Sequence, residues 1–203
     1  MNDWDRYFLD ICKTVSQNSK CLSRKIGAIL VKDKSILSTG YNGPPRGIPH
    51  CGYQRVMTDN VLCSKLIKVF PKEECGGLLQ CSEIDYTCPR QLLMYKSGEG
   101  LDICIASHAE RNVLINAAKN GVSTDGGTLY MNCNIPCKDC LIEIINAGIK
   151  ELVVVEYSFY DSMSKFLLEH SGIDVRTFGN KLVIKDMTDE DGYFGYFNTE
   201  GNQ

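Results

Sequence analysis

Apolar residues recur at two spacings along this chain, and these spacings predict its first helix and its first strands. Between residues 4 and 19 the apolar side chains lie three or four positions apart, which predicts a helix. The apolar runs at 26–31 and 35–41 are typical of strands, and the polar residues 32–34 predict a hairpin turn between them. The segment 40–47 holds three Gly and two Pro and is expected to be irregular.

Helical and strand patterns alternate through the second half of the chain. Asn120-Gly121 is a typical end for the first of these helices. The predicted elements are a helix over 108–120, a strand over 128–133, a helix over 137–147, a strand over 151–156, a helix over 160–170 and a strand over 173–178. Such alternation favours an α/β fold, in which helices cover a sheet.

Residues 51–105 interrupt this pattern and form a predicted insertion within a single domain that spans residues 1–203. Residues 56–70 are compatible with a helix, whereas residues 75–100 are rich in loops and cysteines. A loop of this length inside a domain is usually functional or held by another interaction. The polar tail, about 179–203, shows no clear pattern.

The overall charge favours a small substrate. The net charge is −3 and the pI is about 5.6, whereas proteins that grip nucleic acid usually present a basic face. We therefore expect a discrete small molecule as the partner and no nucleic acid. The chain has no run of 18 apolar residues, so we also expect no membrane span.

The eleven cysteines are a high and odd number. The first residues are acidic and amphipathic, unlike a secretory signal. Without such a signal, metal ligation and free buried thiols are expected in preference to disulfides. We therefore predict a cytoplasmic, reducing environment.

The candidate catalytic residues are His108, Glu110, Cys137 and Cys140. One imidazole and two thiolates supply three ligands for Zn²⁺ and leave the fourth tetrahedral position open for water, as in catalytic zinc sites. Cys137 and Cys140 lie one helical turn apart, at a predicted helix start where the helix dipole favours thiolates. Glu110 follows the histidine by two positions and is placed to move protons to and from that water.

Two other interpretations of this region stay open. Ser107 and Glu110 have the spacing of a capping box, which would give the carboxylate a structural role. Cys133 could supply a fourth ligand and close a structural zinc site, although its strand position favours a small buried side chain. Pro136 is expected in the first turn of the helix that follows.

Two sequence blocks resemble the deoxycytidylate (dCMP) deaminases of the cytidine deaminase superfamily, over about residues 5–178. The first block is His108-Ala-Glu followed by Pro136-Cys-Lys-Asp-Cys, an arrangement typical of zinc-dependent base deaminases. The second is the segment 40–47, which begins Gly-Tyr-Asn-Gly. The resemblance implies a three-layer α/β/α fold of the cytidine-deaminase type, with a central five-stranded mixed sheet and a cysteine-rich insertion.

The resemblance also implies an activity, the zinc-dependent hydrolysis of dCMP to dUMP and ammonia, which supplies dUMP for thymidylate synthesis. Glu110 would pass one proton to N3 of cytosine and another to the leaving amine. The backbone at Ala109 would hold the pyrimidine, and Asn42 would meet the sugar, although Asn-Gly is also a common turn pair. Tyr160 matches the substrate-side tyrosine of the family, with Tyr157 as a competitor.

A phosphate site and a second, structural zinc follow from the same resemblance. Ser23 or Arg24 would hold the 5′-phosphate, although Arg24 is equally compatible with a solvated surface role. Four cysteines in separate loops are the predicted ligands of the second zinc: Cys21, Cys51, Cys88 and Cys104. Rival ligands are His50 and the trio Cys75, Cys81 and Cys88.

Regulation and assembly are implied as well. In many members of the family dCTP with Mg²⁺ activates and dTTP inhibits, and the enzymes are commonly homohexamers. The predicted allosteric residues are Tyr41, Asn42, Gly43 and Arg46. Asn116 and Lys119 depart from the residues common in the family, which leaves the response to these nucleotides open.

Two other functions are compatible with the same residues. A tRNA-type polynucleotide deaminase would share the zinc chemistry but would need a basic approach surface. A catalytically silent, zinc-stabilised interaction module would have no use for Glu110.

Overall fold

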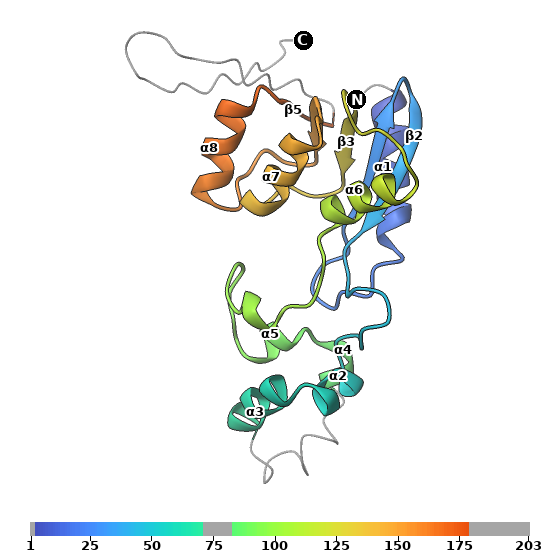
Figure 1. The fold of residues 1–203 in the computed structure, drawn as a ribbon. Coiled ribbons are helices and arrows are strands. Elements are labelled where there is room, and N and C mark those ends of the chain that lie inside the picture. The colour runs from blue at the N-terminus through green and yellow to red at the C-terminus, as the bar shows by residue number, and fades with distance from the viewer. Residues whose placement is uncertain (1–2, 71–82, 179–203) are drawn as a thin grey trace, which may run out of the picture.

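The computed structural model of the protein describes residues 3–70 and 83–178. Its centre is a five-stranded sheet with the strand order β2-β1-β3-β4-β5 (Figure 1). The strands are β1 (Gly27–Lys32), β2 (Ser35–Tyr41), β3 (Thr128–Met131), β4 (Glu151–Val154) and β5 (Asp174–Thr177). β1 runs antiparallel to β2 and β3, whereas β3, β4 and β5 run parallel. The prediction of a five-stranded mixed sheet is confirmed.

The hairpin between β1 and β2 closes through a two-residue turn at Asp33 and Lys34. Both residues have positive φ, at 49° and 60°. A turn of this kind has a twist that matches the twist of the two strands. The predicted hairpin turn is confirmed, and Lys32 belongs to the strand before it.

Four helices cover the two faces of the sheet: α1 (Asp3–Ser16), α6 (Ala109–Lys119), α7 (Lys138–Asn146) and α8 (Ser162–Ser171). α1 packs on one face, and α6, α7 and α8 pack on the other (Figure 1). Alternate residues of β1 point to opposite faces. Ala28 and Leu30 join the buried cluster under α6–α8, whereas Ile29 and Val31 join the cluster under α1. The fold is therefore three-layered.

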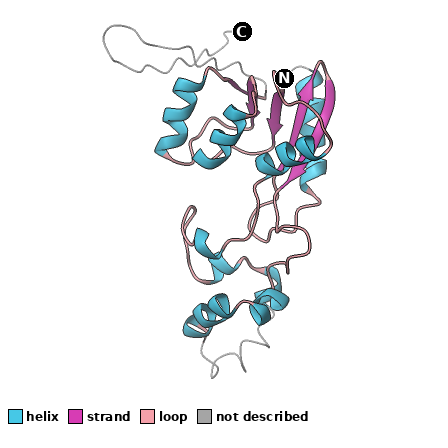
Figure 2. Ribbon diagram, in the orientation of Figure 1, coloured by secondary structure: helices cyan, strands magenta, loops and turns pink. Residues whose placement is uncertain are grey.

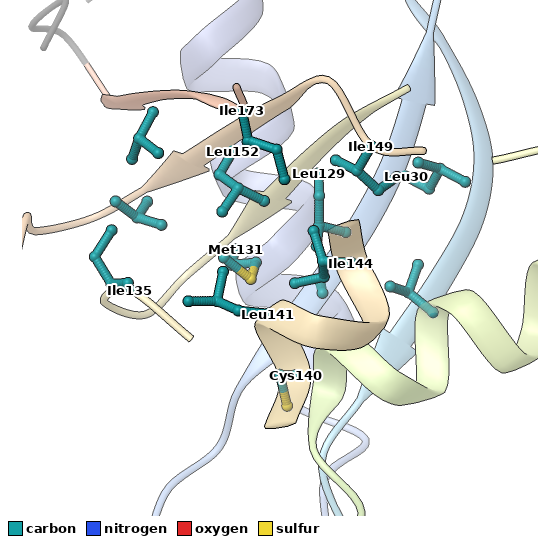
Figure 3. Packing of buried hydrophobic residues seen from close by; sticks show 14 of the residues in the cluster. Leu30, Leu129, Met131, Ile135, Cys140, Leu141, Ile144, Ile149, Leu152 and Ile173 are labelled. Atoms are coloured by element: carbon teal, nitrogen blue, oxygen red, sulfur yellow. The ribbon is translucent and has the colours of Figure 1, made fainter. Parts of the chain in front are cut away.

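The larger cluster of buried side chains lies between the sheet and α6, α7 and α8. Leu141 and Ile144 of α7 face Leu129 and Leu152 of the sheet, and all four are completely buried (Figure 3). Cys140 stands on the same helix, at the end that lies next to α6 (Figure 3). Hydrophobic packing therefore fixes the first turn of α7, which carries one of the predicted zinc ligands.

Two glycines let helices approach the hairpin closely. A Cβ added at Gly40 of β2 would lie 2.3 Å from the backbone nitrogen of Val113, and one at Gly27 of β1 would lie 2.2 Å from the carbonyl oxygen of Cys12. α6 and α1 therefore pack against the strands through backbone atoms. Because α6 begins just after His108, Gly40 helps to set the position of that histidine over the sheet.

The described parts of the insertion, residues 51–70 and 83–105, form a separate group of short helices away from the sheet (Figure 2). The described elements are α2 (Tyr53–Thr58), α3 (Asn60–Val69), α4 (Glu83–Tyr86), α5 (Pro89–Leu92) and the 3₁₀ helix η2 (Leu101–Ile103). They bury a small apolar cluster of their own: Val56, Leu62, Leu66, Ile84, Leu92 and Ile103. Parts of the segment expected to be rich in loops are helical, because these apolar residues pack on one another.

Arg55 connects the first and last elements of this insertion. Its side chain is almost completely buried, and Nη2 donates to the carbonyl oxygen of Ile103 at 2.5 Å and to Oδ2 of Asp59 at 3.1 Å. Asp59 also caps α3, because its Oδ1 accepts a hydrogen bond from the backbone of Leu62 at 2.9 Å. A charged network around the buried Arg55 thus supplements the small apolar cluster.

No helix within residues 3–70 and 83–178 is long and apolar enough to cross a bilayer. The predicted tail, about 179–203, and two of the rival zinc ligands, Cys75 and Cys81, lie outside the described residues.

Candidate zinc and substrate site

The starts of α6 and α7 meet and bring the predicted zinc ligands together. His108 is the N-cap of α6, Cys137 is the N-cap of α7, and Cys140 lies in the first turn of α7. α6 packs on β2 and β1, whereas α7 follows β3, which is the neighbour of β1 in the sheet. Residues 29 and 32 positions apart in the sequence are therefore neighbours in space.

The ligand atoms have the spacing that a tetrahedral zinc site needs. Nδ1 of His108 lies 3.5 Å from Sγ of Cys137 and 3.2 Å from Sγ of Cys140. Ordinary Zn–N and Zn–S bonds in a tetrahedral site separate such atoms by about 3.5 Å. Among the described residues, this is the one set of three or more potential ligands whose atoms all lie within 4.8 Å of one another. The three residues therefore fit the ion.

The start of α6 differs from the suggested capping box. The helix begins at Ala109 with His108 as its N-cap, and Oγ of Ser107 donates to Oδ1 of Asn112 at 2.9 Å. The capping-box prediction is wrong, because the helix starts one residue later than the box requires. The prediction for Pro136 is also wrong, since α7 begins at Lys138 and the proline precedes the N-cap.

Hydrogen bonds and burial shift the pKa values at this site. Hydrogen bonds with Cys140 and with His108 lower the pKa of Cys137. The bond between the two cysteines raises the pKa of Cys140, and the bond between Cys137 and His108 raises the pKa of His108. Burial raises the pKa of Glu110, and the positive charges of His108 and Arg24 act against that effect. Glu110 is only 4% exposed. A buried carboxyl group with a raised pKa is suited to accepting and returning a proton.

Cys133 does not join the zinc ligands. Among the described residues the close set consists of His108, Cys137 and Cys140, and Cys133 is not part of it. Burial, and then the neighbouring carboxylate of Glu110, raise the pKa of Cys133. The arrangement therefore favours an open site with three protein ligands over a site closed by Cys133.

A cavity of about 370 Å³ opens beside the ligand atoms. Its lining includes His108, Glu110 and Cys137. The five residues predicted to bind the substrate also line it: Ser23, Arg24, Asn42, Ala109 and Tyr160. Segments that are far apart in the sequence thus converge on one space, which has the size of a small-molecule site.

Asn42 holds one wall of the cavity in place. Its Oδ1 accepts hydrogen bonds from the backbone of Ile26 and from Oγ of Ser19, both at 2.8 Å. Its Nδ2 donates to the carbonyl oxygen of Arg24 at 2.9 Å. Asn42 therefore fastens the segment before β1 to the end of β2 and positions the backbone of Arg24. These hydrogen bonds account for the burial of Asn42. Asn42 also lines the cavity, and its contact with the sugar stays a prediction.

Of the two tyrosines considered for the substrate side, Tyr160 lines the cavity, whereas Tyr157 packs against the buried cluster under α6–α8. The neighbouring Asp161 anchors this loop. Its Oδ1 accepts from the backbone of Ser164 at 2.7 Å, and its Oδ2 accepts from the backbone of Lys138 at 3.1 Å. Although burial acts in the opposite direction, these hydrogen bonds lower the pKa of Asp161. One carboxylate thus joins the starts of α7 and α8.

Part of the cavity wall was not predicted from the sequence. Arg90, Ser97 and Leu101 of the insertion line it, as do Phe159 and Asn134 in the loops after β4 and β3. Local spacing does not point to these residues, because the insertion reaches the cavity only through the tertiary fold. The sequence gives one indication of Arg90, which follows Cys88, a predicted zinc ligand, by two positions.

The four cysteines predicted to hold a second zinc are partly gathered. Cys21, Cys88 and Cys104 line the cavity. Burial raises the pKa of Cys51, and the charges of the nearby Cys88 and Cys104 add to that effect. Among the described residues, however, no three of these sulfur atoms all lie within 4.8 Å of one another. The second zinc site stays a prediction.

The residues predicted to bind allosteric nucleotides lie at the end of β2 and just after it. Gly43 exchanges two backbone hydrogen bonds with Ser107, at 3.0 and 2.9 Å. Tyr41 and Arg46 are exposed. The loop is therefore attached to the residue that precedes His108, and its role in binding nucleotides stays a prediction.

The fold and the site together define a zinc-binding protein of the base-deaminase class, with one histidine, two cysteines and a buried glutamate at two helix starts. The model of the cytidine and deoxycytidylate deaminase zinc-binding region matches residues 2–156 of the chain. The chain belongs to the cytidine and deoxycytidylate deaminase family.

Several relatives are named deoxycytidylate deaminase. The chain is 30% identical over 176 residues to the protein from Schizosaccharomyces pombe and 28% identical over 175 residues to that from Saccharomyces cerevisiae, with 86% of this chain covered in each case. It spans less than half the length of these two relatives, 44% and 45%. It is 34% identical over 177 residues to the enzyme of Enterobacteria phage T4, with 82% of this chain and 86% of that protein covered.

A crystal structure of the dCMP deaminase from the cyanophage S-TIM5, in complex with dCMP and dUMP, has a similar fold. The TM-score is 0.55 at 26% identity, and the match covers 87% of this chain and 98% of that chain.

Proposed function

We propose that this protein catalyses the zinc-dependent hydrolysis of dCMP to dUMP and ammonia and so supplies dUMP for thymidylate synthesis. The observation that carries the proposal is that His108, Cys137 and Cys140 form one cluster of ligand atoms, and that His108, Cys137 and the buried Glu110 line one cavity. The S-TIM5 relative with bound dCMP and dUMP supports the choice of substrate. The net charge of −3 favours a nucleotide over a polynucleotide.

Three side chains would hold the zinc, through Nδ1 of His108 and the sulfurs of Cys137 and Cys140. When bound, the ion acts as a Lewis acid that lowers the pKa of water towards neutrality. The positive ends of α6 and α7 point at this place and favour the thiolate forms of the two cysteines.

Glu110 would carry the protons of the reaction. Its carboxylate takes a proton from the attacking water and delivers it to N3 of cytosine, which makes C4 more electrophilic. The water oxygen bonds to C4 as a hydroxyl, and Glu110 takes the proton of that hydroxyl and passes it to the exocyclic amine. The C4–N bond then breaks, so that dCMP and water give dUMP and ammonia. The burial of Glu110 separates these protons from bulk solvent.

The other cavity residues would orient the nucleotide. We assign the pyrimidine to the wall at Ala109, the sugar to Asn42 and the outer side of the cavity to Tyr160. We assign the phosphate end to Ser23 and Arg24. The support for these roles is that all five residues line the same cavity as Glu110.

Ammonia release from dCMP, deoxycytidine, dCTP and single-stranded nucleic acid tests this proposal, measured with purified, zinc-loaded protein. We expect turnover of dCMP and none of the polynucleotide. Turnover of the polynucleotide without turnover of dCMP would favour a tRNA-type deaminase. A zinc-loaded protein that is inactive on all four substrates would favour a silent, zinc-stabilised module.

We also propose a second, structural zinc with Cys21, Cys51, Cys88 and Cys104 as its ligands. Cys21, Cys88 and Cys104 line one cavity. The charges of Cys88 and Cys104 act to raise the pKa of Cys51. Metal analysis of a fully active preparation should find two zinc ions per chain, and the variant Cys51→Ser should lose one of them. One zinc per chain in the fully active protein would rule the second site out.

Regulation, assembly and location are proposed on the family resemblance. We expect activation by dCTP with Mg²⁺ and inhibition by dTTP, through Tyr41, Asn42, Gly43 and Arg46, in a cytoplasmic homohexamer. Adding each nucleotide to the dCMP assay tests the regulation, and light scattering tests the assembly. A rate that neither nucleotide changes would remove the regulatory part of the proposal.

A further inference from the structure

Two arginines of the described chain line the cavity, and one of them belongs to the insertion. Among the described residues that line it, Arg24 precedes β1, and Arg90 lies in α5 of the insertion. The charge of Arg24 acts on Glu110 and Cys133, so this arginine stands towards the zinc end of the cavity. Arg90 therefore brings a separate positive charge from another part of the fold.

The guanidinium of Arg90 is held in place by backbone groups. Its Nε donates to the carbonyl oxygen of Glu99 at 2.5 Å, and its Nη2 donates to the carbonyl oxygen of Lys96 at 3.2 Å. These bonds use two donors of a group that has five, arranged as a rigid fork. A fixed guanidinium loses little side-chain freedom when it binds an anion, so the remaining donors are suited to a phosphate.

The turn that holds Arg90 faces the substrate-side tyrosine. The backbone nitrogen of Lys96 donates to Oε2 of Glu99 at 2.9 Å, and that of Glu99 donates to the carbonyl oxygen of Lys96 at 3.1 Å, which closes the turn. A Cβ added at Gly98 would lie 3.6 Å from the hydroxyl oxygen of Tyr160. The insertion thus reaches across to the loop after β4, and Ser97 of the same turn lines the cavity.

We propose that Arg90, with Ser97 beside it, binds the 5′-phosphate of the nucleotide and makes the insertion the part of the protein that selects a nucleoside monophosphate over a nucleoside. This inference rests on the proposed deamination of dCMP. It adds a phosphate ligand, on the part of the cavity wall that the insertion supplies, to the contacts assigned to Ser23 and Arg24. The insertion then supplies specificity, whereas the sheet and its helices supply the chemistry.

The experiment compares kcat/KM for dCMP and for deoxycytidine in the wild type and in Arg90→Gln. Because the variant loses a charge-assisted hydrogen bond to phosphate, we expect kcat/KM for dCMP to fall by about 10- to 100-fold, mainly through a higher KM. The value for deoxycytidine should stay unchanged, because that substrate has no phosphate. Arg90→Lys keeps the charge but not the fork and should recover part of the loss. The matched control is Arg6→Gln, an exposed position on α1 outside the cavity lining, which should change neither value.

Three results would overturn the inference. Equal losses for dCMP and deoxycytidine would show that Arg90 only anchors the turn. Unchanged values for both substrates would show that it does not meet the phosphate. A wild type that deaminates deoxycytidine as efficiently as dCMP would show that no phosphate is recognised, whatever the variants do. Thermal unfolding and zinc content, measured for each variant, identify a loss that comes from misfolding.

The inference and the proposed function fail in different ways. A wild type that deaminates neither dCMP nor deoxycytidine removes the proposed function. A wild type that deaminates dCMP, with a ratio to deoxycytidine that Arg90→Gln leaves unchanged, removes only the role of Arg90.

Discussion

The sheet region and the insertion are stabilised in different ways. Among the described residues, the cluster between the sheet and α6–α8 contains 17 buried apolar side chains, whereas the cluster of the insertion contains six. A core of six side chains is small for an independent unit. The insertion supplements it with the ion pair between the buried Arg55 and the partly exposed Asp59 and, in our proposal, with a structural zinc. The zinc ligands therefore lie on the well-packed region, whereas Arg90, Ser97 and Leu101 of the cavity wall lie on the region that we expect to open first.

The largest expected effect concerns the chemistry on the sheet side. Glu110→Gln keeps the size of the side chain but removes the carboxylate that we propose to carry the proton. General acid–base catalysis contributes about 10²- to 10⁴-fold, so ammonia release from dCMP should fall by at least that factor. Zinc content should stay at the wild-type value. Turnover close to that of the wild type would contradict the assigned proton transfer.

A large structural effect is expected where α6 contacts β2. In Gly40→Ala the new Cβ would lie 2.3 Å from the backbone of Val113 and would push α6, with His108, away from the sheet. Overpacking of this kind costs about 1–3 kcal/mol, so we expect the upper end of that range, with weaker zinc binding. Chemical denaturation and zinc titration measure the two effects. Thr39→Ala, an exposed position on the same strand, is the control and should leave both unchanged.

The insertion should respond separately from the sheet. Arg55→Ala leaves Asp59 and the carbonyl of Ile103 without their buried partner, which is expected to cost about 2–3 kcal/mol. Hydrogen exchange should speed up in α2–α5 and stay slow in β1 and β3. Lys65→Ala removes an exposed ion pair of the same insertion and should change little. Equal loss of protection in the sheet would show that the two regions unfold as one unit.

The smallest expected effect concerns Asp161, which joins the start of α7 to the loop that carries Tyr160. Asp161→Ala removes the cap of α8 and the bond to the start of α7, which should lower the free energy of unfolding by about 1 kcal/mol at pH 7. The pKa of Asp161 is lowered in the folded protein. The ionised carboxylate therefore stabilises the fold at pH values above its pKa in the unfolded chain, about 3.9. This contribution is lost as the pH falls through the lower pKa of Asp161 in the folded protein.

Urea unfolding at a series of pH values checks this prediction. The difference between wild type and Asp161→Ala should shrink from pH 7 towards pH 3. Asp161→Asn keeps a capping oxygen without the charge and should lie between the two proteins at pH 7. A difference that is independent of pH would mean that the charge of Asp161 contributes nothing.

Local patterns predicted the elements of the sheet region closely. The β-branched residues around 151–156 and the apolar spacing over 108–120 gave β4 and α6 to within a few residues. Both patterns are read from neighbours in the sequence, where a strand has a period of two and a helix of 3.6 residues. The start of α6 was predicted one residue early, because Ser107 bonds to Asn112 and does not cap the helix.

The insertion shows where such prediction stops. Its apolar residues bury one another at separations of up to 47 positions, from Val56 to Ile103, and no local period records that contact. The place of Arg90 on the cavity wall has the same origin, since the turn that holds it lies opposite Tyr160 only in the folded chain.

The sequence by itself determined the candidate zinc ligands, one histidine and two cysteines, together with the candidate glutamate, because residue types and their spacing are read directly from the chain. It also determined the alternation of helices and strands that makes a layered fold. Tertiary structure alone decided that α6 and α7 begin side by side, which sets the distances from Nδ1 of His108 to the two sulfurs. It likewise decided which wall faces the zinc ligands, because contacts between distant segments depend on packing over the sheet.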